Sequence, residues 1–332
     1  MKKTLLIPVI AAALAAVGLA AYLGLQGHAG PIRRPPSQET VALTPARVAR
    51  GRYLSEHVLI CWGCHTTRDW SRFGGPITGI RGTGGEDCLT RDHGFPGTVC
   101  PPNVTPDRET GIGAWTDGEV LRALREGVGR DGRALFNEMP YWSFRNLADD
   151  DARAVVAYVR TLPPARNVLP KTELDPSLQR VMDRLARPVE APVPAPDPAD
   201  HLRYGEYLTN LAGCRFCHSD NGDDLEALPG RAFAGGQEFV ERWGTVYSAN
   251  LTPDETGLKK VTKAEFIGRF RAFANPATTA APLPDPTKNT VMPWIEYSGM
   301  TGADLGAIYD FLRTVRPIAN RVVKYPAHPK HR

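Results

Sequence analysis

The sequence predicts an all-α protein in which two tandem domains follow an N-terminal apolar helix. Three observations support this prediction: a four-block internal repeat, helix-capping patterns with apolar residues at helical spacing, and a long apolar run near the N-terminus. At 332 residues the chain can form two domains of moderate size. The net charge is only +4, and no dense Lys/Arg cluster is interleaved with aromatic residues, which excludes a typical nucleic-acid-binding surface.

Residues 1–30 have the pattern of an export segment. Lys2 and Lys3 precede a nearly unbroken apolar run from Leu5 to Leu25, which is long enough to cross a bilayer as a helix. The same stretch also fits a signal peptide, with cleavage after Ala20 or Ala29. Both alternatives place the two lysines in the cytoplasm and everything after residue 30 on the periplasmic side of the bacterial inner membrane, either anchored or exported.

The repeat consists of four blocks that occur twice in the same order. The pairs are Gly51–His65 with Gly205–His218, Gly97–Asp107 with Gly244–Asp254, Met139–Tyr141 with Met292–Trp294, and Tyr158–Pro163 with Tyr309–Thr314. A shared order of matched blocks indicates a duplicated domain. We therefore expect domains at 46–165 and 201–320, a linker at 166–200 and a tail at 321–332.

The linker is expected to act as a semi-rigid strap. Its stretch Ala186–Pro196 has proline at nearly every second position, which excludes helix and favours an extended backbone. Such a strap can hold two domains at limited separation without fusing them.

Helical signals dominate within each domain. Thr116 with Glu119, and Thr262 with Glu265, are capping boxes that predict the start of a helix. Closing helices are expected from Asp149 and Thr301, ended by Pro163 and Pro317. Strand signals are sparse, for example at Gly244–Ser248. A domain of this size with so little apolar periodicity needs something to fill its core.

The two Cys-x-x-Cys-His motifs carry the chemistry of the chain. Cys61, Cys64 and His65 form the first motif, and Cys214, Cys217 and His218 form the second. This motif attaches a c-type haem: the two thiols add to the vinyl groups, and the adjacent histidine reaches the iron. A structural zinc site or disulfide is the alternative, but the two histidines, the predicted export and the lack of a second zinc-type pair near either motif favour haem.

Methionine is the common second axial ligand when the redox potential must be high. Met139 follows His65 by the same interval by which Met292 follows His218, and both precede proline and an aromatic residue. Met139 and Met292 are therefore the predicted ligands, with core packing as the alternative. Met300 is the fallback ligand in the second domain, and Met182 in the linker matches nothing.

The motifs resemble those of the di-haem c-type cytochromes built from two class I cytochrome c folds, in particular the cytochrome subunits of membrane-bound periplasmic dehydrogenases. The resemblance covers about Ala46 to Val315 and rests on the two attachment motifs, the two Asn-x-Thr-Pro-Asp segments and the two Met-Pro pairs. It implies two covalently bound haem c groups, with His65/Met139 and His218/Met292 as axial pairs. Dehydrogenase-linked members often carry three haems, so the partner is not fixed by the motifs.

Cys88 and Cys100 remain after haem attachment. In an exported protein they are expected to form a disulfide, and a ligand or catalytic thiol is the alternative. The Asn-x-Thr-Pro-Asp segments at Asn103 and Asn250 are interpreted as polar turns, with propionate binding as the alternative. Gly51 and Gly205 are expected to let the first and last helices of each domain cross closely, against Tyr158 and Tyr309.

The pattern favours an electron carrier and not an enzyme, because His and Met would close both irons. The expected partners are a periplasmic dehydrogenase as donor and another cytochrome or a terminal oxidase as acceptor, and we expect Trp62, Phe216 and Trp294 to line the docking surface. The alternative is a di-haem enzyme, such as a peroxidase or a thiosulfate-oxidising cytochrome. In a peroxidase, the loop around His93 would supply the mobile ligand.

Overall fold

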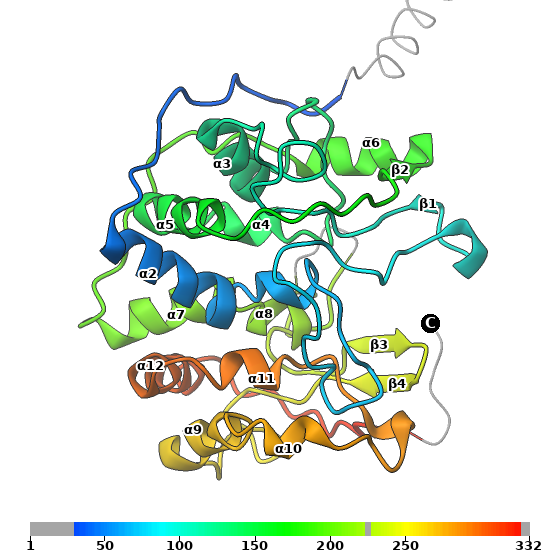
Figure 1. The fold of residues 1–332 in the computed structure, drawn as a ribbon. Coiled ribbons are helices and arrows are strands. Elements are labelled where there is room, and N and C mark those ends of the chain that lie inside the picture. Colours follow the sequence, from blue (N-terminus) through cyan, green and yellow to red (C-terminus); the bar gives the residue numbers. More distant parts are fainter. Residues whose placement is uncertain (1–29, 223–226, 327–332) are drawn as a thin grey trace, which may run out of the picture.

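The computed structural model describes residues 30–222 and 227–326, and in these ranges the regular secondary structure is mainly helical (Figure 1). We call residues 46–165 the first half and residues 201–320 the second half. The elements up to residue 200 are α2 (Pro45–Tyr53), a π-helix (Leu54–Val58), 3-10 turns at Cys61–Gly63 and Arg91–His93, β1 (Gly97–Thr98), α3 (Asp117–Glu126), α4 (Tyr141–Phe144), α5 (Asp149–Arg160), β2 (Glu173–Leu174) and α6 (Pro176–Leu185). After residue 200 they are α7 (His201–Leu211), α8 (Cys214–Cys217), β3 (Glu238–Glu241), β4 (Gly244–Tyr247), α9 (Lys263–Arg271), α10 (Ala277–Ala280), a 3-10 turn at Pro286–Lys288, α11 (Trp294–Tyr297) and α12 (Gly302–Leu312).

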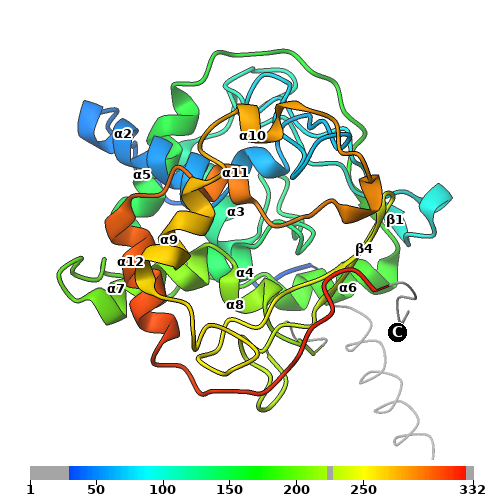
Figure 2. The same cartoon turned by 90° about the horizontal axis from the view of Figure 1, so that it is seen from below.

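The expected all-α class is thus confirmed in the main, with two small antiparallel sheets added. β1 pairs with β2, and β3 pairs with β4 in the register Glu238 to Tyr247. The helices α2, α5, α7, α9 and α12 gather on one side of the molecule, and the strands lie with α6 on the other (Figures 1 and 2).

In each half the first and last long helices cross at a glycine, as predicted. A Cβ on Gly51 would lie 1.8 Å from the carbonyl oxygen of Ala154, and a Cβ on Gly205 would lie 2.1 Å from that of Ala307. Any side chain at these positions would push α2 away from α5, or α7 away from α12. The duplicated crossing therefore requires glycine for close approach.

The predicted alignment of the closing helices was wrong by two residues. The contacts of Gly51 are Ala154 and Tyr158, whereas those of Gly205 are Ala307 and Phe311, so Tyr158 corresponds to Phe311 and not to Tyr309. A shift of two residues on a helix moves a side chain to nearly the opposite face. Tyr309 instead donates a hydrogen bond to the Val261 carbonyl within the second half, at 2.8 Å.

Both capping boxes form as predicted. The Thr116 hydroxyl accepts from the Glu119 amide at the start of α3, and Thr262 does the same with Glu265 at the start of α9. The closing helices begin at Asp149 and just after Thr301, and both end before the predicted prolines. The expected strand near Gly244 is β4.

The linker is less simple than a strap. It contains β2 and α6, whose Met182 is buried in a small cluster with Val128, Ala134 and Tyr141 of the first half. Proline at the first turn and Leu178, Met182 and Leu185 on one face explain why a helix forms here. The proline-rich stretch after α6 contains no helix or strand, as expected.

The two halves are in direct contact, contrary to the expected separation. One hydrophobic core runs through both halves and includes Leu54 and Trp62 from the first and Leu208 and Leu305 from the second. In Figure 1 the helices α2 and α5 of the first half lie above α7 and α12 of the second half. The linker therefore joins two halves that already share a core.

Two reciprocal hydrogen bonds cross this interface. Tyr53 of the first half donates to Asp304 of the second, and Tyr207 of the second donates to Asp151 of the first, at 2.7 Å. Each tyrosine oxygen also accepts from a backbone amide at the start of the same closing helix, that of Thr301 or Ala148. Burial and the facing carboxylate raise the pKa of both tyrosines, which keeps each proton on the donating oxygen.

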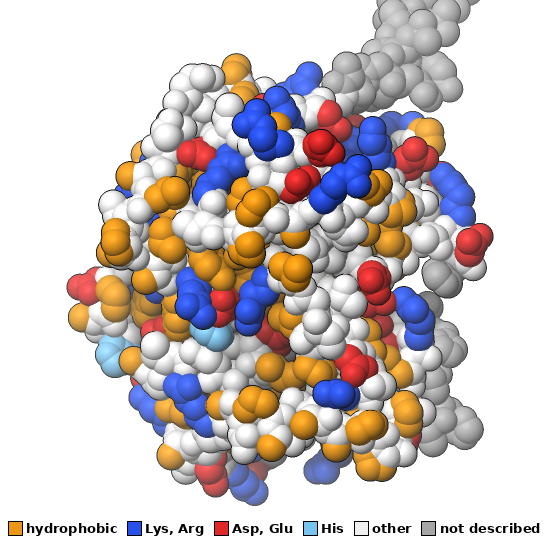
Figure 3. Space-filling view, viewed as in Figure 1, with side chains coloured by type: hydrophobic (Ala, Val, Ile, Leu, Met, Phe, Trp, Pro, Cys, Tyr) orange, Lys and Arg blue, Asp and Glu red, His pale blue; other side chains and the backbone are white. Residues whose placement is uncertain are grey.

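The ends of the chain are described in part. The predicted export segment, residues 1–30, lies outside the described residues except for Gly30. None of the helices in the described ranges has both the length and the apolar character that a bilayer-spanning helix requires. The predicted tail is described to residue 326, and its Lys324 carbonyl accepts from the Tyr247 amide. Figure 3 shows basic and acidic side chains interspersed on one face, without a patch of one sign.

Candidate haem sites

The two Cys-x-x-Cys-His motifs adopt the same local geometry. A residue in the left-handed region precedes each motif, Ile60 with φ 48° and Gly213 with φ 68°. Within each motif the histidine amide donates to the carbonyl of the first cysteine at 3.0 Å. This single helical turn brings the two cysteines and the histidine to one side of the chain. Ile60 is β-branched, so its left-handed conformation is strained, by about 1–3 kcal/mol, as is common at functional sites.

Both motif histidines have the orientation of a metal ligand. Nδ1 of His65 bonds the Pro102 carbonyl at 2.8 Å, and Nδ1 of His218 bonds the Ala249 carbonyl at 2.7 Å. Because a carbonyl only accepts, Nδ1 carries the proton in each ring and Nε2 keeps its lone pair. Burial lowers the pKa of both rings, which favours the neutral imidazole that binds metals.

The Asn-x-Thr-Pro-Asp segments fix these two carbonyls. Asn103 directly follows Pro102, and its side chain accepts from the Thr105 amide and donates to the Ala165 carbonyl at 2.7 Å. Asn250 directly follows Ala249 and makes the matching bonds to Thr252 and Ile318. Protein groups thus hydrogen-bond both the oxygen and the nitrogen of each asparagine side chain, which favours the polar-turn interpretation over propionate binding. Sequence reasoning missed the two carbonyl partners, although each immediately precedes the repeated asparagine.

The four motif thiols all have raised pKa values. Cys64 is exposed to solvent, yet surrounding protein raises its pKa to about 11, and burial raises the pKa of Cys61, Cys214 and Cys217 to about 12. Redox-active and zinc-binding cysteines instead need a stabilised thiolate. Within the described part of the chain, no three His, Cys, Asp or Glu side chains group closely enough to hold a metal ion. The thiols therefore fit covalent attachment of a haem and not zinc or thiol–disulfide chemistry.

The two predicted methionines lie in matching turns. Pro140 and Pro293 have nearly the same backbone angles, and each begins a four-residue helix, α4 or α11. Met139 and Met292 are both half-buried at the edge of the main core. Met300, the fallback ligand, is instead 1% exposed inside that core, and Met182 is 2% exposed under α6. This burial favours packing roles for Met300 and Met182.

The turn after Met139 of the first half contacts the second attachment motif. Burial and, to a smaller extent, the carboxylate of Glu138 raise the pKa of Cys64 and Cys217. The ring of Trp142 contacts that of Phe216, which lies between Cys214 and Cys217, at a centroid distance of 4.7 Å. No sequence signal pointed to this proximity, because it depends on how the two halves pack.

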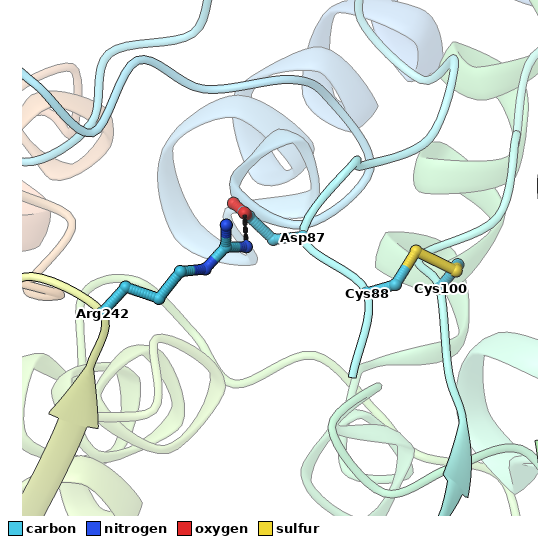
Figure 4. Close-up of a disulfide and its surroundings, with 4 residues drawn as sticks. All are labelled: Asp87, Cys88, Cys100 and Arg242. Atoms are coloured by element: carbon cyan, nitrogen blue, oxygen red, sulfur yellow. Dashed lines mark hydrogen bonds and ion pairs between the residues drawn. A yellow bond between two sulfur atoms is a disulfide. The ribbon is translucent and has the colours of Figure 1, made fainter. Parts of the chain in front are cut away.

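The predicted disulfide is confirmed, with Cys88 bonded to Cys100 (Figure 4). Its neighbour Asp87 pairs with Arg242 of the second half at 2.6 Å and accepts from the Trp70 indole at 2.8 Å. Cys100 lies two residues before Pro102, whose carbonyl orients His65. In the second half the corresponding cross-strand pair is Glu238 and Tyr247, joined by a 2.5 Å hydrogen bond.

The expected docking residues do not form one surface. Trp62 is 1% exposed and packs against Tyr158 in the core, so that expectation was wrong. Phe216 contacts Trp142, and Trp294 lies between Phe270 and Phe273. Among the other histidines, His57 bonds the Glu296 carbonyl across the interface at 2.9 Å, and His201 is largely exposed. The side chain of His93 lies outside what the structure describes.

No family model matches the chain. Comparison with curated proteins finds a "Diheme cytochrome c-type" protein of Cereibacter sphaeroides, 30% identical over 213 residues that cover 62% of this chain and 68% of the relative. The fructose dehydrogenase cytochrome subunit of Gluconobacter japonicus is 27% identical over 297 residues, 86% of this chain and 56% of that protein. A nicotinate dehydrogenase subunit of Pseudomonas putida is 37% identical over 165 residues, 48% of this chain and 13% of that protein.

These relatives fit the geometry described above. The chain matches only part of each dehydrogenase-subunit relative: 13%, 42% and 56% of the length of three of them. The di-haem relative is covered over more than two thirds of its length. The chain therefore belongs to the di-haem c-type cytochromes, proteins that carry covalently bound haem c.

Proposed function

We propose that this chain is the electron-transfer subunit of a periplasmic dehydrogenase and passes electrons to a respiratory acceptor. Several similar proteins are named as cytochrome subunits of fructose, alcohol and gluconate dehydrogenases, which supports a dehydrogenase as donor. The basic residues and apolar run at the N-terminus support a site of action outside the cytoplasm. In this proposal residues 46–165 and 201–320 each form one cytochrome c domain.

Each domain is proposed to hold its haem through the two motif cysteines and two axial ligands. Cys61 and Cys64 would tether the first haem and Cys214 and Cys217 the second, and the irons would be held by His65 with Met139 and by His218 with Met292. When bound, each haem supplies an iron that exchanges one electron. The imidazole and thioether are both neutral donors, and a thioether raises the potential by favouring the ferrous state.

The protein residues do three things around each site. The Pro102 and Ala249 carbonyls hold the histidine rings in one orientation with Nε2 free. The Met-Pro turns place a half-buried methionine at the edge of the core, where a thioether is available as a ligand. With a histidine and a methionine at each iron, no coordination position would remain for a substrate, which fits a carrier and not an enzyme.

The observation that carries the proposal is the contact between the turn after Met139 and the second attachment motif. The ring of Trp142 in this turn contacts Phe216, which lies between Cys214 and Cys217, and one hydrophobic core runs through both halves. Two redox sites joined in this way could exchange electrons inside the molecule. A donor can then reduce one site while an acceptor oxidises the other.

The ligand assignment is tested by redox titration with far-red absorption, which reports methionine–iron bonds. We expect Met139→Ala and Met292→Ala each to lose about half of the far-red band and to lower one of the two midpoint potentials. Met182→Ala is the matched control, because this methionine lies in a packing cluster, and its band should equal that of the parent protein.

The carrier role is tested on the same samples. The parent protein is given half of one reducing equivalent per chain. The electron should then distribute between the two sites of one chain before that chain meets another, so the rate of this internal transfer should not depend on protein concentration. High-spin iron together with peroxide turnover in the parent protein would contradict the proposal and favour a di-haem enzyme.

A further inference from the structure

A side chain in the segment that leads into Met292 is hydrogen-bonded to the first half. Asn289, three residues before Met292, is fully buried and hydrogen-bonded to the loop 69–76 of the first half. Its Oδ1 accepts from the Gly74 amide at 2.9 Å, and its Nδ2 donates to the carbonyls of Trp70 at 2.9 Å and Arg72 at 3.2 Å.

This side-chain amide has no bonding capacity left over. Besides the Gly74 amide, Oδ1 accepts from the Thr290 amide at 2.8 Å, so both lone pairs of the oxygen and both protons of the nitrogen are used. No other residue type offers two acceptor sites and two donors from a group of this length. The pattern indicates that Asn289 is placed to lock two backbone segments together.

From Asn289 the connection continues to the predicted ligand. The Met292 amide donates to the Thr290 hydroxyl at 3.1 Å, and the Met292 carbonyl accepts from the Trp294 amide at 2.8 Å to begin α11. Both backbone groups of Met292 are therefore fixed, one through Asn289 and Thr290 and the other by α11. The position of the Met292 thioether thus depends on where loop 69–76 lies.

Loop 69–76 is itself well anchored beside the first haem motif. It begins four residues after His65 and is closed by a hydrogen bond from the Asp69 amide to the Pro76 carbonyl at 3.0 Å. A second bond across the halves, from the Leu283 amide to the Ser71 carbonyl at 3.0 Å, and a stack of Phe73 on Phe273 hold the same loop. A change near His65 can reach Met292 through this short path.

The first half has no matching arrangement. Phe136 occupies the position three residues before Met139, and it packs against Phe95 of the same half at a centroid distance of 5.3 Å. Its carbonyl accepts from the Met139 amide at 3.1 Å, again within the first half. In the described residues, no such side-chain bond from the second half leads to the Met139 backbone, although the turn after Met139 contacts Phe216.

We propose that Asn289 is a positioning residue for the second haem site: loop 69–76 of the first half, acting through Asn289 and Thr290, sets the position of the Met292 thioether. This inference rests on the proposed function, which assigns Met292 as an axial ligand. It makes the potential of the second site depend on the integrity of the first half, while the first site does not depend in this way on the second.

The test compares Asn289→Ala with Asn275→Ala in the full-length protein with both haems attached. Asn275 is a suitable control because it also lies in the second half and accepts one backbone amide, that of Ala277, but is exposed and makes no bond to the first half. Asn289→Ala should lose about half of the far-red band and lower the potential of one site only, because a displaced thioether no longer stabilises ferrous iron. Asn275→Ala should match the parent.

Hydrogen–deuterium exchange gives a readout that does not involve the haem. Peptides covering 69–76 and 282–292 should exchange faster in Asn289→Ala, since the Gly74 and Thr290 amides lose their acceptor. If Asn289→Ala does not accumulate, Thr290→Val replaces it: this variant keeps every bond between the halves and removes only the acceptor of the Met292 amide, so the far-red band should again weaken.

The outcomes separate this inference from the proposed function. A far-red band that falls in Met292→Ala but stays complete in Asn289→Ala, or in Thr290→Val where that variant replaces it, would overturn the positioning role and leave the ligand assignment intact. A band that stays complete in Met292→Ala would overturn the ligand assignment and this inference with it. Equal shifts of both potentials in Asn289→Ala would contradict the one-directional dependence.

Discussion

Removal of the Cys88–Cys100 disulfide should destabilise the protein and disturb only the first haem site. The bond closes a loop between residues 12 positions apart. In the chain-entropy description, opening a loop of this length costs about 3 kcal/mol. The double variant Cys88→Ser/Cys100→Ser should therefore unfold at a clearly lower guanidinium concentration than the parent protein, when ellipticity is followed and a common slope is used.

The same variant should affect the orientation of His65. Cys100 is two residues from Pro102, and the backbone between them is held by paired bonds of Leu89 with Val99 and a bond from the Gly85 amide to the Pro101 carbonyl. Without the disulfide the Pro102 carbonyl is held less firmly, and a histidine that loses its Nδ1 acceptor is a weaker donor to iron. We expect the potential of the first site to rise while that of the second stays constant.

A matched comparison comes from the second half, where Glu238 and Tyr247 take the place of the disulfide. Tyr247→Phe removes one hydrogen bond and should cost about 1 kcal/mol, well below the cost of losing the disulfide. A loss below about 1 kcal/mol in the cysteine variant would refute the reasoning on stability. Equal shifts of both potentials would refute the proposed path from the disulfide to His65.

Two further predictions concern the core and the interface. Met300→Ala should leave the far-red band unchanged but destabilise the protein by about 2–5 kcal/mol, because it empties a fully buried site; loss of part of the band would mean that Met300 is a ligand after all. Tyr207→Phe should cost about 1–3 kcal/mol, because Asp151 loses a donor and the Ala148 amide loses its acceptor. Denaturant unfolding measures this loss, and an unchanged midpoint would show that the bond across the halves contributes nothing.

Local features of the fold were predictable from the sequence. The capping boxes at Thr116 and Thr262 form because a hydroxyl and a carboxylate three residues apart satisfy the free amides of a helix start wherever it occurs. The crossings at Gly51 and Gly205 followed from their position in the repeat. The disulfide followed from counting cysteines in an exported protein.

Features that depend on packing between distant segments could not be predicted in this way. The reciprocal bonds of Tyr53 and Tyr207 involve single polar side chains, which leave no periodic pattern in the sequence. The Pro102 and Ala249 carbonyls are backbone groups that any residue could supply. Helix α6 was a missed signal and not an unpredictable one, because Pro176 and the apolar spacing after it mark a helix.

The misaligned tyrosines show how residue identity can mislead. Tyr158 and Tyr309 share a residue type but not a position, whereas the spacing from the glycine contacts pairs Tyr158 with Phe311. With that register, Arg160 and Arg313 also occupy equivalent positions. Arg160 donates to carbonyls in the segment before α3, and Arg313 donates to carbonyls in the segment before α9. Geometry is thus a better guide to equivalence between duplicated helices than a shared aromatic residue.

The exchange of tyrosine–aspartate bonds between the halves has the pattern of a two-fold dimer, in which each protomer offers the other the same surface. In a dimer of identical chains, every substitution at such a surface would change both sides of the interface at once. Once both copies lie in one chain, each side can change alone: Arg50, which binds Asp151, occupies the position that Tyr204 holds in the other copy. Covalent fusion thereby allows the two redox centres to acquire different surroundings, and hence different potentials, without loss of their association.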